Sequence, residues 1–339
     1  MVKVRLMAVA TLFCTLVTGS ALAGSEVKYD AELTGLTYQL PVSHYQLESQ
    51  GQTLSMAYSF IEPSEGMPVV TLLHGKNFNG DYWAPTARFL EKRGYGVLVP
   101  DQIGFGKSSK PLGYQFSFSV LAGNTRALMK VLGIESSIVF GHSMGGMLAT
   151  RFALQYPQVV DELVLINPIG LEPYHLLSEY KDVDFHFANE MRKTAAGIQK
   201  YQQTFYYDGQ WSEAYAKLTE FAVGQINGPD WERVARVNAQ TTDIIFTQPV
   251  FAEFPALSVP TSLVIGTRDR TAPGRGWKRE GVDIEMGRYD QLGKLTAARI
   301  PNAKLYEMEG LGHMPQVEDF DQYSEIISQI LANLQSRKG

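Results

Sequence analysis

The amino-acid sequence predicts an α/β fold in which a doubly wound, mostly parallel sheet is interrupted by a helical insert. Short runs such as VVTLL from Val69 and LVLINP from Leu163 are apolar throughout, as is typical of strands buried on both faces. These runs alternate with helix-like segments, which favours parallel strand order. The alternation stops between Leu171 and Pro255, where the sequence is helical or irregular and rich in aromatic residues, and strand-like runs return afterwards.

The individual elements follow a regular order along the chain. Two alternating stretches on either side of Gly51, HYQLES and LSMAYSF, predict an antiparallel hairpin. Strands are then predicted at VVTLL from Val69, YGVLVP from Tyr95, SIVF from Ser137, LVLINP from Leu163, TSLVIGTRD from Thr261 and AKLYEMEG from Ala303. Helices are predicted at YWAPTARFLEKRG, FSVLAGNTRALMKVLG, MLATRFALQYP and YSEIISQILANLQ, with Gly94 closing the first and Pro157 stopping the third.

The composition indicates a globular protein with enough material for a large core. The chain has 339 residues, of which 45% are hydrophobic and 19% are charged. This length suits one large domain with an insertion, or two domains. The net charge is -5 and the sequence has no long basic run, so nucleic acid is not expected to be a partner.

The N-terminus has the pattern of a cleaved secretory signal. Lys3 and Arg5 precede the apolar run LMAVATLFCTLV, which is short for a membrane span, and Ala21 and Ala23 fit a small-x-small cleavage site. A signal peptide of this kind would direct the protein to the periplasm or outside the cell and would be removed by cleavage after Ala23. The single cysteine, Cys14, lies in the apolar run, so the mature chain is expected to have no disulfide, thiolate nucleophile or Cys-ligated metal.

These observations divide the chain into four parts. Residues 1–23 are the predicted signal peptide, and residues 24–170 are the first part of the α/β core. Residues 171–255 form the predicted helical cap, and residues 256–339 complete the core. No internal repeat and no low-complexity segment is found in the sequence.

The stretch VFGHSMGGMLA is the strongest candidate for a catalytic motif. It places Ser143 between Gly141 and Gly145, at the junction of a predicted strand and a predicted helix. A Gly-x-Ser-x-Gly pattern alone is weak evidence, since a tight structural turn has the same composition. In the strand–helix context it is typical of a nucleophile elbow, where the glycines permit a turn too tight for side chains.

A nucleophilic serine needs a base, and the base needs an orienting acid. In an elbow fold these follow in the order Ser, then Asp or Glu, then His, at the ends of strands. Asp269 follows the strand TSLVIGTRD, and His313 follows the last strand in a glycine-flanked loop. Among the other histidines, His142 and His74 are expected to pack or to form hydrogen bonds near the site. The sequence therefore predicts Ser143, His313 and Asp269 as a catalytic triad.

Two backbone N–H groups are expected to hold the developing oxyanion. One is that of Met144, at the start of the helix after Ser143. The other should lie in the loop HGKNFNGDYW after VVTLL, where the N–H of Lys76 is the first candidate and that of Asn77 the second. A plain Gly/Asn turn is the alternative interpretation of this loop.

Taken together, these motifs resemble those of the α/β-hydrolase superfamily, in particular its capped members. The resemblance runs from about Tyr38 to the C-terminus and rests on the HG loop, DQIGFGKSS, GHSMGG, DRTAP and GHMPQVEDF. It implies an eight-stranded, mostly parallel sheet with helices on both faces and a helical cap after strand 6. It also implies that Ser143, Asp269 and His313 are catalytic, with Met144 and Lys76 as oxyanion donors.

The resemblance leaves the substrate open. The serine argues against epoxide hydrolases and haloalkane dehalogenases, which use an aspartate nucleophile. An exported, carboxylesterase-like enzyme that cleaves an ester or lactone is favoured, and a proline iminopeptidase-like aminopeptidase or amidase, or a C–C bond hydrolase, is the alternative. For an amine substrate, the acids Glu172, Glu179, Glu213 and Glu232 of the insert are candidates. A binding protein without activity is the third possibility.

Substrate contacts are expected from the cap aromatics, with Phe205, Tyr206 and Trp211 as candidates. The spacing of 44 positions between Asp269 and His313 is longer than such relatives commonly have. The additional residues, 274–294, are expected to form a rim loop that is either structural or carries Trp277, Arg275 or Arg288 to the cleft.

No cofactor and no metal is expected, and the expected partner is a small-molecule ester, lactone or amide. No stable membrane span is expected in the mature chain, and the sequence does not determine the oligomeric state.

Overall fold

The computed structural model describes residues 27–338, so the predicted signal peptide and its cleavage site after Ala23 lie outside the described residues. Within this part of the chain, eight strands form one sheet in the order β1-β2-β4-β3-β5-β6-β7-β8. The strands are β1 (Ser43–Ser49), β2 (Gln52–Ile61), β3 (Val69–Leu73), β4 (Gly96–Pro100), β5 (Ser137–His142), β6 (Val160–Ile166), β7 (Thr261–Gly266) and β8 (Lys304–Met308).

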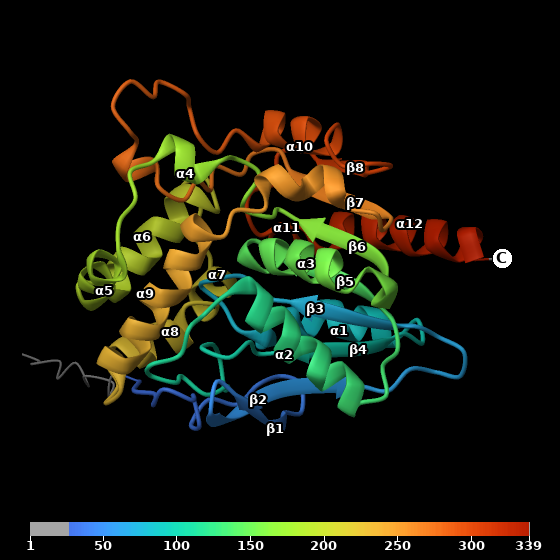
Figure 1. Ribbon diagram of the computed structural model, residues 1–339, viewed down its shortest axis with the longest axis horizontal. Coiled ribbons are helices and arrows are strands. Elements are labelled where there is room, and N and C mark those ends of the chain that lie inside the picture. Colours follow the sequence, from blue (N-terminus) through green and yellow to red (C-terminus); the bar gives the residue numbers. More distant parts are fainter. Residues whose placement is uncertain (1–26, 339) are drawn as a thin grey trace, which may run out of the picture.

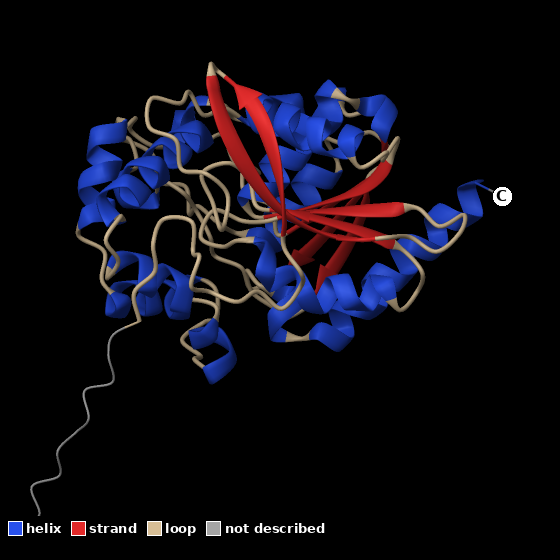
Figure 2. Ribbon diagram, turned by 90° about the horizontal axis from the view of Figure 1, so that it is seen from below, coloured by secondary structure: helices blue, strands red, loops and turns tan. Residues whose placement is uncertain are grey.

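Strand pairing confirms the predicted mostly parallel sheet. β1 pairs antiparallel with β2, β2 pairs antiparallel with β4, and the remaining neighbours pair parallel. Every residue of β3, β4, β5 and β7 is buried, which is why these segments are mostly apolar and show no alternation of polar and apolar residues. Figure 2 shows the strong twist that such a sheet acquires, with helices on both of its faces.

The core helices cover the two faces of the sheet. α2, α3 and α10 supply apolar side chains to one buried cluster, and α1 and α12 supply them to the other. The bounds of the core segments are η1 (Gly80–Trp83), α1 (Ala84–Glu91), α2 (Phe118–Val131), α3 (Met144–Gln155), η2 (Pro157–Val159), η4 (Arg275–Trp277), α10 (Tyr289–Ala297), α11 (Pro315–Glu318) and α12 (Phe320–Lys338). The predicted first helix is shorter than its pattern suggested, because α1 ends three residues before Gly94, whose φ of 83° stops a helix.

A helical cap lies between β6 and β7, as the fold prediction requires. Its segments are α4 (Tyr174–Leu177), α5 (Val183–Met191), α6 (Ala195–Phe205), α7 (Glu213–Lys217), α8 (Glu220–Ile226), α9 (Trp231–Thr247) and η3 (Phe251–Ala256). Figure 1 shows these helices gathered at one end of the sheet, toward which the parallel strands run. The cap therefore covers the edge where the loops after β3, β5, β7 and β8 meet.

The segment before β1 fastens this cap to the core. The N–H of Tyr29 donates to the carbonyl of Gly224 in α8, and the N–H of Ala31 donates to the Asp230 carboxylate before α9. Arg233 of α9 pairs with Glu32. Gly228 lies so close to this segment that a Cβ there would approach the Tyr29 carbonyl oxygen to 1.8 Å.

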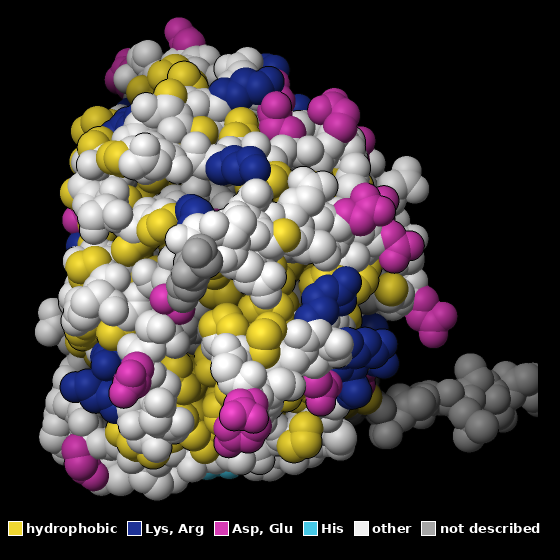
Figure 3. All heavy atoms as spheres, turned by 90° about the vertical axis from the view of Figure 1, so that its right-hand side faces the viewer, with side chains coloured by type: hydrophobic (Ala, Val, Ile, Leu, Met, Phe, Trp, Pro, Cys, Tyr) yellow, Lys and Arg dark blue, Asp and Glu magenta, His cyan; other side chains and the backbone are white. Residues whose placement is uncertain are grey.

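The face opposite the cap carries charged side chains of both signs. In Figure 3, Lys and Arg side chains alternate with Asp and Glu side chains, and apolar side chains lie between them. A surface of this kind produces no extended field of one sign over that face. Among residues 27–338, no helix combines the length and the hydropathy needed to cross a bilayer.

Candidate active site

Ser143 lies on a sharp turn between β5 and α3. Its φ of 57° and ψ of -123° are strained for a residue with a side chain, and strain of this kind is concentrated at functional sites. The glycines permit the turn, because a Cβ on Gly141 would lie 2.3 Å from the Gly145 carbonyl oxygen, and one on Gly145 would lie 2.3 Å from the Leu73 carbonyl oxygen. The turn thus brings α3 against the end of β3, as a nucleophile elbow requires.

His313 and Asp269 come together in the buried interior of the site. Asp269 follows β7 and His313 follows β8, and Nδ1 of His313 lies 2.7 Å from Oδ2 of Asp269. Both side chains have no exposed surface. Nε2 of His313 is also buried, and within the described residues it has no hydrogen-bond partner. Asp269 therefore orients the imidazole through Nδ1, while Nε2 remains available to a partner.

The surroundings of Asp269 favour the ionised form of its carboxyl group. Burial alone would raise the pKa of its carboxyl group, but His313, the side-chain amide of Asn167 and the N–H of Thr271 together hold that pKa below its usual value. Asn167 Nδ2 donates to Oδ2 at 2.8 Å, and Thr271 N–H donates to Oδ1 at 2.7 Å. Asn167 directly follows β6, so the rule that functional residues follow strands provided a signal for it in the sequence.

His142 links the nucleophile, oxyanion and base loops. Its Nε2 lies 2.8 Å from the His313 carbonyl, which can only accept, so Nε2 carries the proton. Its Nδ1 then accepts from the Tyr82 hydroxyl at 3.0 Å, and that hydroxyl accepts the N–H of Gly75. Burial, with His313 nearby, lowers the pKa of His142 to about 3, which keeps the ring neutral. The structure thus gives His142 the packing and hydrogen-bonding position that the sequence predicts for it.

The two predicted oxyanion donors lie beside Ser143. Met144 is the first residue of α3, so its N–H has no acceptor in a preceding helical turn. A Cβ on Gly75 would lie 3.1 Å from Cβ of Ser143, which puts the HG loop directly against the nucleophile. His74 fixes this loop, because its Nδ1 lies 3.0 Å from the Gly75 carbonyl and its Nε2 accepts the N–H of Gln102.

A cavity of about 240 Å³ includes Ser143 among its lining residues. Of the three cap aromatics predicted as substrate contacts, Tyr206 lines this cavity, and Phe205 and Trp211 do not. Trp211 instead packs on Tyr207, and Phe205 faces the guanidinium of Arg275. The reason is that α6 ends at Phe205, so the aromatic residues around its end point in different directions.

Tyr206 also contacts two other parts of the site. Its hydroxyl accepts from Nδ2 of Asn77 at 3.0 Å, and its ring lies over His313 with centroids 4.5 Å apart. Its carbonyl accepts the N–H of His313. The cap is therefore joined to both the oxyanion loop and the base loop by one residue.

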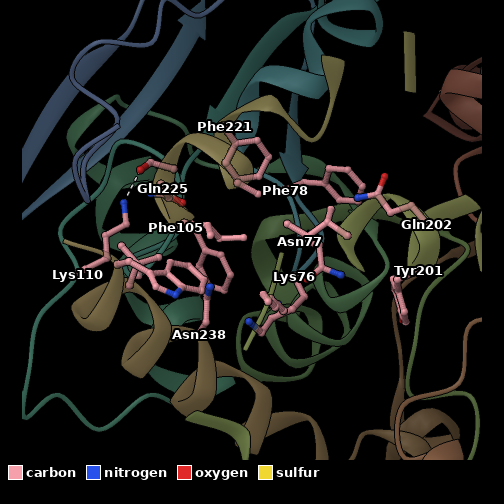
Figure 4. A pocket seen from close by; sticks show the side chains of 18 of the residues that line it. Lys76, Asn77, Phe78, Phe105, Lys110, Tyr201, Gln202, Phe221, Gln225 and Asn238 are labelled. Carbon is pink, nitrogen blue, oxygen red and sulfur yellow. Dashed lines mark hydrogen bonds between the residues drawn. The ribbon is translucent and has the colours of Figure 1, made fainter. Parts of the chain in front are cut away.

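A second cavity of about 200 Å³ adjoins the first. The two share Lys76, Asn77, Lys193 and Tyr201 in their linings. Figure 4 shows the rings of Phe78, Phe105 and Phe221 around it, together with the side chains of Lys76 and Lys110. The space near Ser143 thus continues into a mostly apolar compartment that contains lysine side chains.

The chain between Gly274 and α10 packs against the cap. Trp277 lines the Ser143 cavity, and its carbonyl accepts the N–H of Glu179. Arg288 is engaged by Glu285 and Asp290 instead of pointing to the cavity. This segment therefore has both a structural contact to the cap and one side chain in the cavity.

Glu172 holds the same segment from the cap side. The buried carboxylate accepts the N–H of Gly287 at 3.0 Å, and burial raises its pKa from 4.5 to about 7. The folded protein therefore retains a proton that the unfolded chain has released between these two pKa values. The stability that this proton contributes is lost as the pH rises through about 7.

We expect the substitution Glu172→Gln to remove this pH dependence. The free energy of unfolding of the wild type should fall by about 2 kcal/mol more than that of the variant between about pH 5 and pH 8. Urea unfolding at several pH values measures this, and Glu280→Gln, at an exposed position of the same segment, should behave like the wild type. Equal pH profiles for Glu172→Gln and the wild type would contradict the prediction.

The acids predicted to bind an amine do not line the Ser143 cavity. Glu172 is committed to Gly287, Glu179 pairs with Lys181, and Glu213 and Glu232 are exposed. The carboxylate that does line the cavity is Glu190 of α5. Glu190 was not among the residues predicted from the sequence, because α5 carries more than one acidic residue and no sequence pattern indicates which of them faces the cavity.

Comparison with known proteins places these features in context. A sequence model of the alpha/beta hydrolase fold matches residues 68–320. The solved structure of a probable hydrolytic enzyme from Pseudomonas aeruginosa PAO1 is 43% identical and superposes with a TM-score of 0.87 over 90% of this chain and 98% of that one. Lipase 1 of Psychrobacter immobilis is 26% identical over 284 residues, which are 82% of each chain. A putative carbamate hydrolase, RutD, of Stutzerimonas stutzeri is 27% identical and matches 78% of this chain and 92% of its own length.

Proposed function

Because the chain belongs to the α/β-hydrolase fold family, we propose that it is a serine hydrolase that cleaves carboxylic esters or lactones through an acyl-enzyme. The observation that carries this proposal is the combination of Ser143 on a strained elbow with a buried His313–Asp269 pair, in which Nε2 of His313 has no hydrogen-bond partner in the described part of the chain. The similarity to a lipase from Psychrobacter immobilis over most of both chains supports ester substrates.

In the proposed mechanism, Ser143 Oγ attacks the ester carbonyl while Nε2 of His313 accepts its proton. Asp269 stabilises the resulting imidazolium and keeps the proton of the neutral ring on Nδ1. The C–O bond to the leaving group then breaks as His313 returns the proton to the alcohol. A water molecule, activated by the same nitrogen, attacks the acyl-serine and releases the acid.

The oxyanion of each tetrahedral intermediate is proposed to accept from the N–H groups of Met144 and Lys76. The position of Met144 at the N-terminus of α3 supports this, because the helix dipole is positive there. The N–H of Lys76 has no acceptor among the described residues, and it follows the glycine that touches Ser143. Both donors are in place before the charge develops.

An ester is favoured over an N-terminal peptide bond by the state of Glu190. A substrate ammonium group would need a carboxylate partner, but the charge of Glu190 is already neutralised by Lys193, which lies 2.8 Å from Oε2, and the same oxygen accepts from Asn238. Lys76 and Lys193 in the same lining would repel the ammonium. The cavity therefore opposes the binding of an aminoacyl substrate.

Two assays on purified protein test the proposal. A fluorophosphonate probe should label Ser143, as located by mass spectrometry of the digested protein. Hydrolysis of p-nitrophenyl butyrate should be rapid, while that of prolyl or alanyl p-nitroanilide should be undetectable. Absence of labelling at Ser143, or faster turnover of the anilides than of the ester, would overturn the proposal.

Export is part of the same proposal. The N-terminal pattern of the sequence, which precedes the described residues, supports cleavage after Ala23 and action in the periplasm or outside the cell. N-terminal sequencing of the protein recovered from the periplasmic fraction checks this. A protein recovered from the cytoplasm with an intact N-terminus would contradict it.

A further inference from the structure

The side chain of Lys76 is a cation that the proposed mechanism does not use. It lines both the Ser143 cavity and the adjoining apolar one. Its ammonium group forms no hydrogen bond and no ion pair with any described residue, and it lies over the ring of Phe105, 5.7 Å from the ring centroid. Lys76 is half-buried, and the partial loss of solvent around its ammonium group favours an anionic or carbonyl partner.

A more deeply buried lysine of this region shows how a structural ammonium group is satisfied. Lys110, which lines the adjoining cavity, donates to the carbonyls of Gly106 and Ser108. Its ammonium therefore has a structural role. Among residues 27–338, no carbonyl accepts from the Lys76 ammonium, so this group remains available to a ligand in the cavities that it lines.

The charges around Lys76 do not cancel. Lys193 and Glu190 form an ion pair at 2.8 Å, and Asn238 donates a further hydrogen bond to Glu190. Counting the three ionisable groups, Lys76 and Lys193 contribute two positive charges and Glu190 one negative charge, which leaves one positive charge. A single carboxylate on the substrate would neutralise this excess where the surrounding side chains weaken screening by solvent.

We propose that Lys76 binds a carboxylate of the substrate, so that the enzyme prefers esters that carry one negative charge close to the scissile bond. This inference rests on the proposed ester hydrolysis and names its substrate class. The position follows from the chain itself, because the backbone of Lys76 lies in the oxyanion loop and its side chain extends to the junction of the two cavities. The apolar remainder of the substrate would occupy the aromatic lining.

Matched esters test the inference on the full-length mature protein. In the first pair, p-nitrophenyl hydrogen glutarate carries the carboxylate on the acyl side, and p-nitrophenyl pentanoate is its neutral counterpart. In the second pair, 4-(butyryloxy)benzoate carries it on the leaving group, and phenyl butyrate is neutral. The wild type should prefer the anionic member of one pair in kcat/KM by about tenfold or more. The pair that shows the preference identifies the side of the scissile bond.

Substitutions at Lys76 then assign the preference to its charge. The change Lys76→Met keeps the backbone N–H and an unbranched side chain that is one atom shorter, and it should lower the anionic-to-neutral ratio by about tenfold. Lys76→Arg should retain most of the ratio, because the positive charge remains. Lys200→Met on the exposed surface of α6 is the matched control, and it should leave the ratio unchanged.

The pH dependence of the ratio provides a second readout. Burial lowers the pKa of Lys76 to about 8, although Glu190 opposes the shift and Lys193 adds to it. The ratio should therefore fall as the pH rises through about 8, and this fall should be absent in Lys76→Met. The other charged or titratable groups near Lys76 are His186 of α5, Tyr201 and Tyr206 from α6 and its C-terminal end, and Lys110 across the adjoining cavity.

The outcomes separate this inference from the function on which it rests. Hydrolysis of neutral esters without any preference for the anionic members, or a preference that persists in Lys76→Met, would overturn the role of Lys76 and leave the esterase proposal intact. Failure to hydrolyse any of the four esters would overturn both. A preference that is lost in Lys76→Met and kept in Lys76→Arg supports the inference.

Discussion

The substitution Ser143→Ala is expected to lower kcat for p-nitrophenyl butyrate hydrolysis by about 10⁴-fold or more. The reason is that the variant keeps the cavity and the oxyanion donors but has no oxygen to form the acyl-enzyme. Removing one hydroxyl from a cavity should leave the fold intact, so the melting temperature should change little. Initial rates and a thermal melt of both proteins measure the two effects.

A matched control makes the result specific. Ser336 lies on the exposed surface of α12, where its hydroxyl donates to a backbone carbonyl, so Ser336→Ala should retain full activity. A Ser143→Ala protein that folds and keeps a tenth or more of the wild-type rate would show that the elbow serine is not the nucleophile. In that case the strained turn would have a purely structural role.

The substitution Asp269→Asn should produce the second largest loss, about 10²- to 10⁴-fold in kcat. An asparagine has one acceptor oxygen where the aspartate has two. If that oxygen accepts the N–H of Thr271, the amide group faces two donors, Asn167 Nδ2 and His313 Nδ1. His313 then moves its proton to Nε2, where it cannot accept a proton from serine.

The kinetic pattern distinguishes this mechanism from unfolding. KM should change little, because Asp269 is fully buried and does not line the Ser143 cavity. Asp283→Asn, at an exposed position between Gly274 and α10, is the matched control and should retain the wild-type kcat. Equal kcat values for Asp269→Asn and the wild type would refute the assignment of the acid.

Much of the fold could be predicted from the sequence because buried parallel strands leave a distinct pattern. VVTLL and SIVF are mostly apolar, with no alternation of polar and apolar residues, since β3 and β5 lie in the middle of the sheet with helices on both faces. The elbow could be predicted for a related reason. Its glycines are required because a Cβ on Gly141 or Gly145 would lie 2.3 Å from a backbone oxygen, so the elbow is visible in the sequence as a local motif around Ser143.

The parts of the site that came from the cap could not be predicted in the same way. Aromatic residues at the end of α6 look alike in the sequence, yet Tyr206 lines the cavity while Trp211 packs on its neighbour Tyr207. Their directions depend on how α6 ends and on which core loop each residue meets. The sequence contains no local signal for either.

The sequence by itself determined the sheet and the elbow, because backbone geometry within a few residues dictates both patterns. It also contains Ser143, Asp269 and His313 in the order in which such a fold uses them. The tertiary structure alone decided which cap side chains face the nucleophile. It brought Glu190 and Lys193 of the cap to Lys76 of the oxyanion loop, and within residues 27–338 it left the Lys76 ammonium without a hydrogen bond or an ion pair. The physical reason is that the charge of a cavity is a sum over residues far apart in the chain, and folding alone brings them together.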